Sequence, residues 1–150
     1  MPAPLLKVTE INHVALFVTN LERSRKFYVE VLGFEDRTSR VNPGQAMSSN
    51  PTMTFLFAGS QSLDLFQVSS GNVGVGRDMS HLALCVDADE IDDVSAVLEA
   101  AGVSGLERTP RNTVFISDPD GHRIEILPRA ANAPAREQRA APEDAKEITQ

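Results

Sequence analysis

Two short segments of the chain alternate their side chains in the way of half-buried β-strands. They read INHVALFV at 11–18 and MSHLALCV at 79–86. His, Ala, Leu and Val stand at matching places in both segments, 68 residues apart. Self-similarity at a fixed spacing is typical of repeated structural units. The pattern therefore predicts two copies of one module.

Each predicted strand is followed by a helical pattern. Apolar residues recur at spacings of three and four over 21–32 and again over 91–101, which is the period of a helix with one buried face. A glycine ends each pattern, Gly33 in the first half and Gly102 in the second. Because glycine readily adopts the left-handed conformation that closes many helices, we expect both to be helix caps.

The remainder of each half predicts three more strands. The last two of each half are expected to form a hairpin, because turn-forming residues separate them. The segments are 34–40, 53–59 and 62–68 in the first half, and 103–109, 113–118 and 122–128 in the second. The predicted fold is α+β, with two tandem βαβββ modules.

The two modules are expected to form one domain over residues 10–128, because one helix cannot cover both faces of a module's sheet. We place module 1 at about 10–70 and module 2 at about 79–128, with the Gly- and Ser-rich stretch 69–79 as the join. Residues 1–9 are a lead-in. Residues 129–150 contain one large aliphatic side chain, Ile148, and are predicted to be a disordered tail.

Charge and composition exclude several classes of protein. The 150 residues carry a formal net charge of −7, which opposes binding to nucleic acid. No apolar run is long enough to span a membrane, and no secretion signal is recognisable, so we expect a cytoplasmic protein. The single cysteine, Cys85, cannot form an intramolecular disulfide and is predicted to be a buried thiol within its strand.

Strand alternation places several reactive side chains on the face opposite the helices. His13 and Phe17 share this open face in the first half, and His81 lies on it in the second. Glu125 stands between Ile124 and Ile126 and points the same way, with Arg123 beside it. Leu63-Asp64-Leu65 repeats the pattern of Ile124-Glu125-Ile126, which places Asp64 at the matching position of module 1.

Two imidazoles and a carboxylate on one face suggest a metal site. Neutral imidazole and carboxylate bind Fe²⁺, Mn²⁺, Zn²⁺, Ni²⁺ or Co²⁺ and leave coordination positions open for substrate. Taken singly, each histidine is more simply explained as a hydrogen-bonded strand residue; taken together, His13, His81 and Glu125 favour metal binding. Asp64 has three alternatives: a ligand, an acceptor beside a ligand, or a partner for a cation such as Arg123.

The motifs resemble those of the vicinal oxygen chelate superfamily, the group of glyoxalase I, extradiol dioxygenases, fosfomycin-resistance enzymes and bleomycin-resistance proteins. They are His-x-Ala-Leu-x-Val, then Leu-x-x-Ser-x-x-Phe-Tyr-x-x-x-Leu-Gly-Phe at 21–34, and Asp-Pro-Asp-Gly-His-x-Ile-Glu at 118–125. The resemblance implies paired βαβββ modules forming a cupped, mostly antiparallel sheet, and a homodimer. It assigns His13, His81 and Glu125 as metal ligands, Glu125 as the catalytic carboxylate, and Asp64 to the variable ligand position.

One scaffold supports many reactions in this superfamily, so the reaction remains open. We expect a small substrate that chelates the metal through neighbouring oxygens, with Phe17, Phe66 and Arg123 contacting it. An iron- or manganese-dependent dioxygenase is the first hypothesis, although its usual additional acid or base could come only from His122 or Tyr28. A glyoxalase-like lyase, isomerase or epimerase is the alternative. A bleomycin-resistance-like binding protein is the alternative of another class, disfavoured because that class lacks the metal ligands.

Overall fold

The computed structural model of the chain describes residues 5–6, 8–69, 81–129 and 131. It forms two compact units, Met1–Gly74 and Val75–Gln150, and each is described here by itself. Apart from residues 129 and 131, the predicted disordered tail lies outside the described residues, as does most of the predicted join at 69–79. The expectation of one domain over 10–128 stays a prediction.

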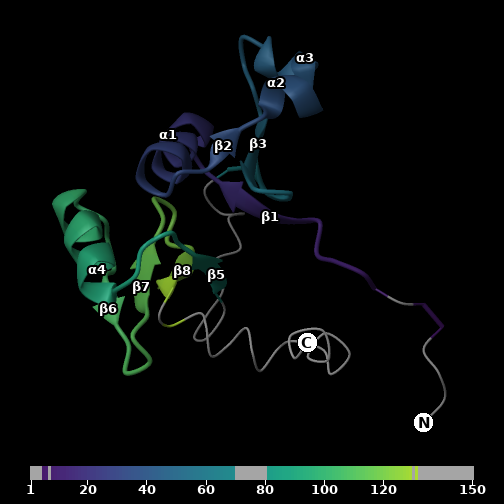
Figure 1. Cartoon of the computed structure of the whole chain (residues 1–150). Coiled ribbons are helices and arrows are strands. Elements are labelled where there is room, and N and C mark those ends of the chain that lie inside the picture. Colours follow the sequence, from purple (N-terminus) through teal and green to yellow (C-terminus); the bar gives the residue numbers. More distant parts are fainter. Residues whose placement is uncertain (1–4, 7, 70–80, 130, 132–150) are drawn as a thin grey trace. The chain divides into compact units, whose positions relative to one another are not determined.

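The first unit is built on a four-stranded sheet in the order β1-β4-β3-β2. The edge strand β1 runs parallel to β4, and the remaining pairs are antiparallel. The strands are β1 (His13–Val18), β2 (Glu35–Asp36), β3 (Met53–Ala58) and β4 (Gln61–Gln67). Figure 1 shows α1 (Leu21–Lys26) beside this sheet, where it contacts β3 and β4.

The predicted first helix is present, but its second half is a π-helix. Asn20 caps α1 by accepting a hydrogen bond from the Arg23 amide at 3.0 Å. The chain then continues as η1 (Phe27–Val31). Tyr28 is fully buried there, and its ring meets those of Phe27 and Phe34 edge to face. Gly33 ends the helix with a φ of 78°, as predicted.

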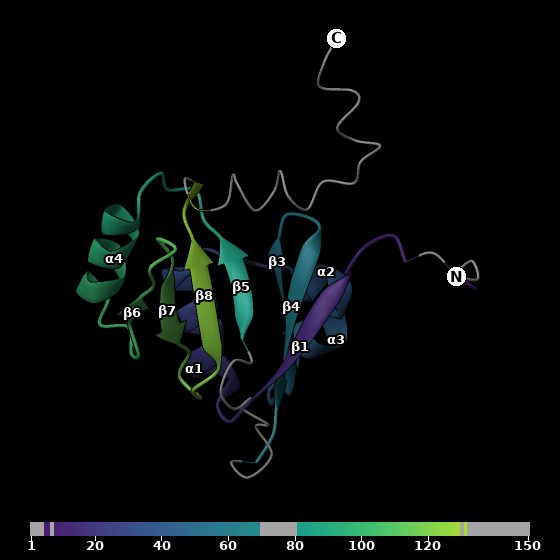
Figure 2. The same ribbon diagram turned by 90° about the horizontal axis from the view of Figure 1, so that it is seen from below.

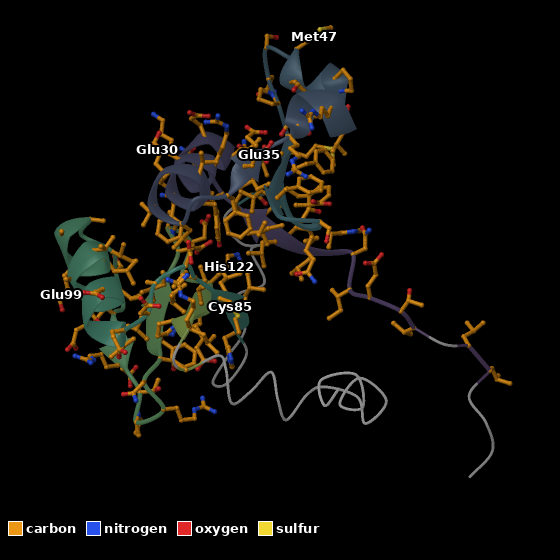
Figure 3. All side chains as sticks on the ribbon, in the orientation of Figure 1. Glu30, Glu35, Met47, Cys85, Glu99 and His122 are labelled. Carbon is orange, nitrogen blue, oxygen red and sulfur yellow. The ribbon has the colours of Figure 1, made fainter. Side chains whose placement is uncertain are left out.

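The segment after η1 differs from the expectation of a strand over 34–40. Only Glu35–Asp36 pairs with β3, and two short helices follow, α2 (Thr38–Val41) and α3 (Pro43–Ala46). Asp36 accepts from the Thr38 amide at 2.9 Å, which turns the chain out of the sheet. Asn42 caps α3 with proline in its first turn. Met47 follows α3, is labelled in Figure 3, and is 84% exposed.

The second unit repeats the plan of the first. Its sheet has the order β5-β8-β7-β6, with β5 parallel to β8 and the other pairs antiparallel. Figure 2 shows these four strands and α4 beside them. The elements are β5 (Leu82–Cys85), α4 (Ile91–Ala100), β6 (Glu107–Arg108), β7 (Val114–Ser117) and β8 (Arg123–Leu127). The predicted repeat of strand, helix and three strands is confirmed.

Burial follows the predicted faces in the central strands. Leu63 and Leu65 of β4 and Ile124 and Ile126 of β8 are at most 2% exposed, and α4 buries Ile91, Val94 and Leu98. Gly102 ends α4 with a φ of 68°, as predicted.

The edge strands are less covered than the alternation predicted. Val14, on the predicted helix-facing side of β1, is 37% exposed, because α1 contacts β3 and β4 rather than this edge. The prediction of a buried Cys85 thiol was wrong. Cys85 is exposed at the end of the edge strand β5, on its open face.

A cluster of hydrogen-bonded polar side chains joins α1, α2 and β3 in the first unit. Asp36 accepts from Arg25 Nε at 2.7 Å and from the Thr38 hydroxyl at 2.6 Å. Because that hydroxyl gives its hydrogen to the carboxylate, the Thr54 hydroxyl at 2.7 Å must donate to it. Burial alone would raise the pKa of Asp36, but the bonds from Thr38 and Arg25 outweigh burial and lower that pKa.

We expect Asp36→Asn to destabilise the chain by about 1–2 kcal/mol at pH 7, because it weakens charge-assisted hydrogen bonds. The lowered pKa means that the ionised carboxylate stabilises the fold above the unfolded pKa of about 4, and that this stabilisation is lost as pH falls through the folded pKa. Urea unfolding at pH 7 and pH 3 measures the free energy of unfolding of the variant and of the wild type. The difference from wild type should shrink at pH 3; Glu30→Gln, an exposed carboxylate change, is the control.

Candidate functional site

The open face of the second unit brings His81 and Glu125 together. Glu125 lies in β8, opposite Ala83 of β5 and Phe115 of β7, and is 7% exposed. His81 directly precedes β5, which lies beside β8. Its Nε2 is 3.2 Å from Glu125 Oε2, and its ring meets the Phe115 ring edge to face at 5.0 Å. Parallel pairing of β5 with β8 therefore produces the predicted histidine–glutamate pair.

The second oxygen of Glu125 is held by a threonine. The Thr113 hydroxyl lies 2.7 Å from Glu125 Oε1 and the residue is 3% exposed. An ionised carboxylate can only accept, so Thr113 donates. The Thr109 hydroxyl, 2.7 Å from that of Thr113, must then donate to Thr113. Thr109 thus donates to Thr113, and Thr113 donates to Glu125 Oε1. The other oxygen, Oε2, faces His81.

The Thr109 side chain also ties the turn that carries this chain of hydrogen bonds. Its hydroxyl oxygen accepts from the backbone amides of Arg111 at 3.2 Å and Thr113 at 3.3 Å. Asn112 takes the left-handed conformation between them, with a φ of 59°. The turn before β7 is thus shaped so that Thr113 reaches the carboxylate.

A cavity of about 240 Å³ adjoins His81 on this face. Phe115 and Arg123 form part of its wall, and the Arg123 guanidinium lies over the Phe115 ring, 5.1 Å from its centroid. Arg123 also donates to the Gly105 carbonyl at 2.8 Å and the Ser117 hydroxyl at 3.2 Å. It is therefore on the open face, as predicted, with its charge engaged by neighbouring groups.

The first unit carries a similar pair, His13 and Asp64. His13 Nε2 lies 3.9 Å from Asp64 Oδ2, and the Ser62 hydroxyl donates to Asp64 Oδ1 at 2.8 Å. His13 Nδ1 is 2.8 Å from the side-chain oxygen of Asn12. Because an amide oxygen only accepts, Nδ1 carries the hydrogen and the neutral ring presents the lone pair of Nε2. This is the form in which histidine binds a metal.

The other sequence-predicted residues are placed as follows. Phe17 and Phe66 are register partners on β1 and β4, with ring centroids 6.4 Å apart. Asp64 accepts from Ser62 and lies near His13, and the three alternatives for its role stay predictions. Tyr28 is fully buried, and His122, labelled in Figure 3, is 8% exposed in the connection before β8.

Sequence reasoning missed the hydroxyl donors. Ser62 stands two residues before Asp64 on the same strand face, so strand alternation could have indicated it. Thr113 directly precedes β7, the strand paired with β8, and Thr109 acts on Glu125 only through Thr113. Nothing in the local sequence singles out either threonine.

The donor chemistry suits a divalent metal ion. Imidazole nitrogen and carboxylate oxygen are a ligand pair for zinc, iron, nickel or manganese, and an ion between His81 and Glu125 would replace the hydrogen that Nε2 donates there. Each unit brings one histidine and one carboxylate together. Within the described ranges, no group of three or more His, Cys, Asp or Glu side chains has the arrangement of a metal site.

Comparison with protein families identifies the chain. The model of the Glyoxalase/Bleomycin resistance protein/Dioxygenase superfamily matches residues 10–126. The chain belongs to this superfamily. The resemblance seen in its motifs is therefore confirmed, and the α+β fold with two tandem modules agrees with it.

Named relatives of the superfamily are similar over most of the chain. Lactoylglutathione lyase of Haemophilus influenzae is 32% identical over 128 residues, covering 79% of this chain and 91% of the relative. Metallothiol transferase FosB of Staphylococcus epidermidis is 24% identical over 127 residues, covering 81% and 82%. Both relatives bear the names of enzymes.

A solved structure of the superfamily shows the same fold. Glyoxalase I of Leishmania major aligns with a TM-score of 0.63 at 22% identity, covering 94% of this chain and 98% of that one. In the part of the chain that is described, no helix has the length and apolar character needed to cross a membrane.

We expect Thr113→Val to weaken binding of a divalent metal by about tenfold, the lower end of the range typical of residues that orient a ligand. Valine keeps the shape of threonine but removes the hydroxyl that donates to Glu125 Oε1 at 2.7 Å. Thr113→Ser restores the hydroxyl and should bind metal as wild type does. Calorimetric titration with Zn²⁺ measures all three proteins. Equal affinity in the valine variant would contradict the orienting role.

Proposed function

We propose that the chain is a divalent-metal-dependent enzyme that acts on a small molecule binding the metal through neighbouring oxygens. The observation that supports this most directly is the 3.2 Å approach of His81 Nε2 to Glu125 Oε2 beside a cavity. His13 is the proposed third ligand, supported by its Nε2 lone pair. The contact between Asp64 and Ser62 supports a role for Asp64 as an acceptor near the ligands.

The residues of this site would have two roles, binding the divalent ion and transferring a proton. A bound divalent ion would supply Lewis acidity that polarises the substrate oxygens. Glu125 would hold the ion, and Thr113 fixes the Oε1 atom of this carboxylate. A carboxylate held in this way is also positioned to accept a proton from carbon next to a polarised carbonyl and to return it. The Phe115 ring excludes water from one side of the cavity.

Proton transfer by a glyoxalase-like lyase or isomerase is the reaction that we favour. The names of the lactoylglutathione lyases among the relatives support it. The dioxygenase hypothesis needs a further acid or base near the substrate. Both residues considered for that role, Tyr28 and His122, are buried rather than presented on the open face.

The proposal also keeps the expectations of a homodimer and of a cytoplasmic location, both supported by resemblance and composition. The alternative of another class is a non-catalytic protein of the bleomycin-resistance kind, which binds a metabolite or antibiotic in the same cup. Stoichiometric metal with turnover distinguishes the enzyme from the binder.

Elemental analysis of the protein purified without chelators tests the metal site. We expect about one divalent ion per chain, because the three proposed ligands form one site. Three ligands also leave positions open for substrate. Glu125→Gln should lose the ion, since an amide is a weaker ligand. The control is Glu99→Gln on α4, an exposed position labelled in Figure 3, which should keep the ion. Nickel or zinc would support the isomerase reading and iron the dioxygenase reading; metal-free wild-type protein after reconstitution would contradict the proposal.

Activity separates the enzyme from the binding protein. We expect the metal-loaded chain to exchange with solvent the hydrogen on the carbon next to a carbonyl, in a small substrate that binds the metal through neighbouring oxygens. His13→Ala and His81→Ala should each lower the rate by at least about a hundredfold, because loss of one ligand weakens the metal and misplaces the substrate. Circular dichroism verifies that both variants are folded. Full activity in either variant would show that its histidine is not a ligand.

A further inference from the structure

The turn between β6 and β7 carries an arginine beside Glu125. Arg111 Nη2 lies 3.4 Å from Glu125 Oε1, and the arginine side chain is 73% exposed. The turn itself is fixed, because the Thr109 amide donates to the Thr113 carbonyl at 2.9 Å and the Arg111 amide donates to the Thr109 hydroxyl. Hydrogen bonds of the turn therefore fix the backbone of Arg111, while its exposed guanidinium extends towards Glu125.

The other arginines near this cavity are bound to other partners. Arg108 Nη2 lies 2.7 Å from Asp92 Oδ1, and Arg123 is held by Gly105, Ser117 and the Phe115 ring. The side-chain partner that the structure gives Arg111 is the same carboxylate proposed to bind the metal. Binding of a metal would therefore change the surroundings of Arg111 more than those of Arg108 or Arg123.

The change is electrostatic. Once an ion binds Oε2 and Thr113 keeps Oε1, the negative charge of Glu125 is offset by the ion. Arg111 is then a cation close to another cation, and like charges at such distances repel. An anionic group lying between them removes the repulsion and is attracted to both. The planar guanidinium matches the two oxygens of a carboxylate, of which one can remain on the metal.

We propose that Arg111 recognises the carboxylate of a small 2-hydroxy or 2-oxo carboxylate bound at the metal site. This inference rests on the proposed metal-dependent function and narrows its substrate class. The adjoining cavity of about 240 Å³ is smaller than the range of about 300–1,000 Å³ for drug-sized ligands, which agrees with a molecule of this size.

Lactate and lactamide test the inference, because they share a skeleton and a hydroxyl and differ in charge. Calorimetry measures the binding of each to the Co²⁺-loaded chain, and the ratio of the two affinities is compared between variants. Arg111→Gln should lower the lactate-to-lactamide ratio about tenfold, the value of one charge-assisted hydrogen bond. Arg111→Lys keeps the charge and should retain part of the preference.

Two further measurements make the result specific. Arg40→Gln removes the same charge from α2 and should leave the ratio unchanged. Co²⁺ affinity in Arg111→Gln should equal or exceed that of wild type, because a repelling cation has been removed.

An unchanged ratio in Arg111→Gln, with Co²⁺ bound, overturns the inference and leaves the proposed function standing. Weaker Co²⁺ binding in that variant also overturns it, because Arg111 would then serve to hold Glu125. A wild-type chain that binds no Co²⁺ removes the proposed function and this inference together.

Discussion

The open face of the second unit depends on a carboxylate that is withdrawn from water. Glu125 stands in a strand between two buried isoleucines and is 7% exposed. An ionised group in such a place is costly unless donors replace its hydration. Thr113 and Arg111, both in the turn before β7, and His81 before β5 provide donors from two parts of the chain. Holding this one charge therefore positions the turn before β7 and the start of β5, and shapes the face beside the cavity.

Residues whose place follows from strand period and repeat were predictable from the sequence. Strict alternation puts Glu125 opposite the faces of Ile124 and Ile126, and the observed register of β8 agrees. The same period places Asp64 on the open face of β4. The repeat also relates His13 to His81 across 68 residues, and the structure repeats the parallel pairing of β1 with β4 in that of β5 with β8.

The remaining features depend on contacts that a periodic pattern does not encode. Asp36 binds the Thr38 amide at the start of α2, where a strand was expected, and Asn42 binds the Gln45 amide at the start of α3. Exposure of Cys85 depends on what covers the edge strand β5, which alternation within β5 cannot reveal. Thr113 reaches Glu125 across a strand pair, so its role requires knowledge of the register as well as of the sequence.

The two units follow one plan with different geometry, and the difference bears on which residues bind a metal. Asp64 has one methylene fewer than Glu125, and its gap to the histidine is 3.9 Å rather than 3.2 Å. Its hydroxyl partner, Ser62, lies on its own strand, whereas Thr113 reaches Glu125 from the neighbouring strand pair. Asp64 is therefore bound to its own strand. The His13 side chain is 51% exposed, and its Nδ1 is oriented by Asn12 rather than by Asp64. This asymmetry supports the proposed ligand set of His13, His81 and Glu125, in which Asp64 is an acceptor rather than a ligand.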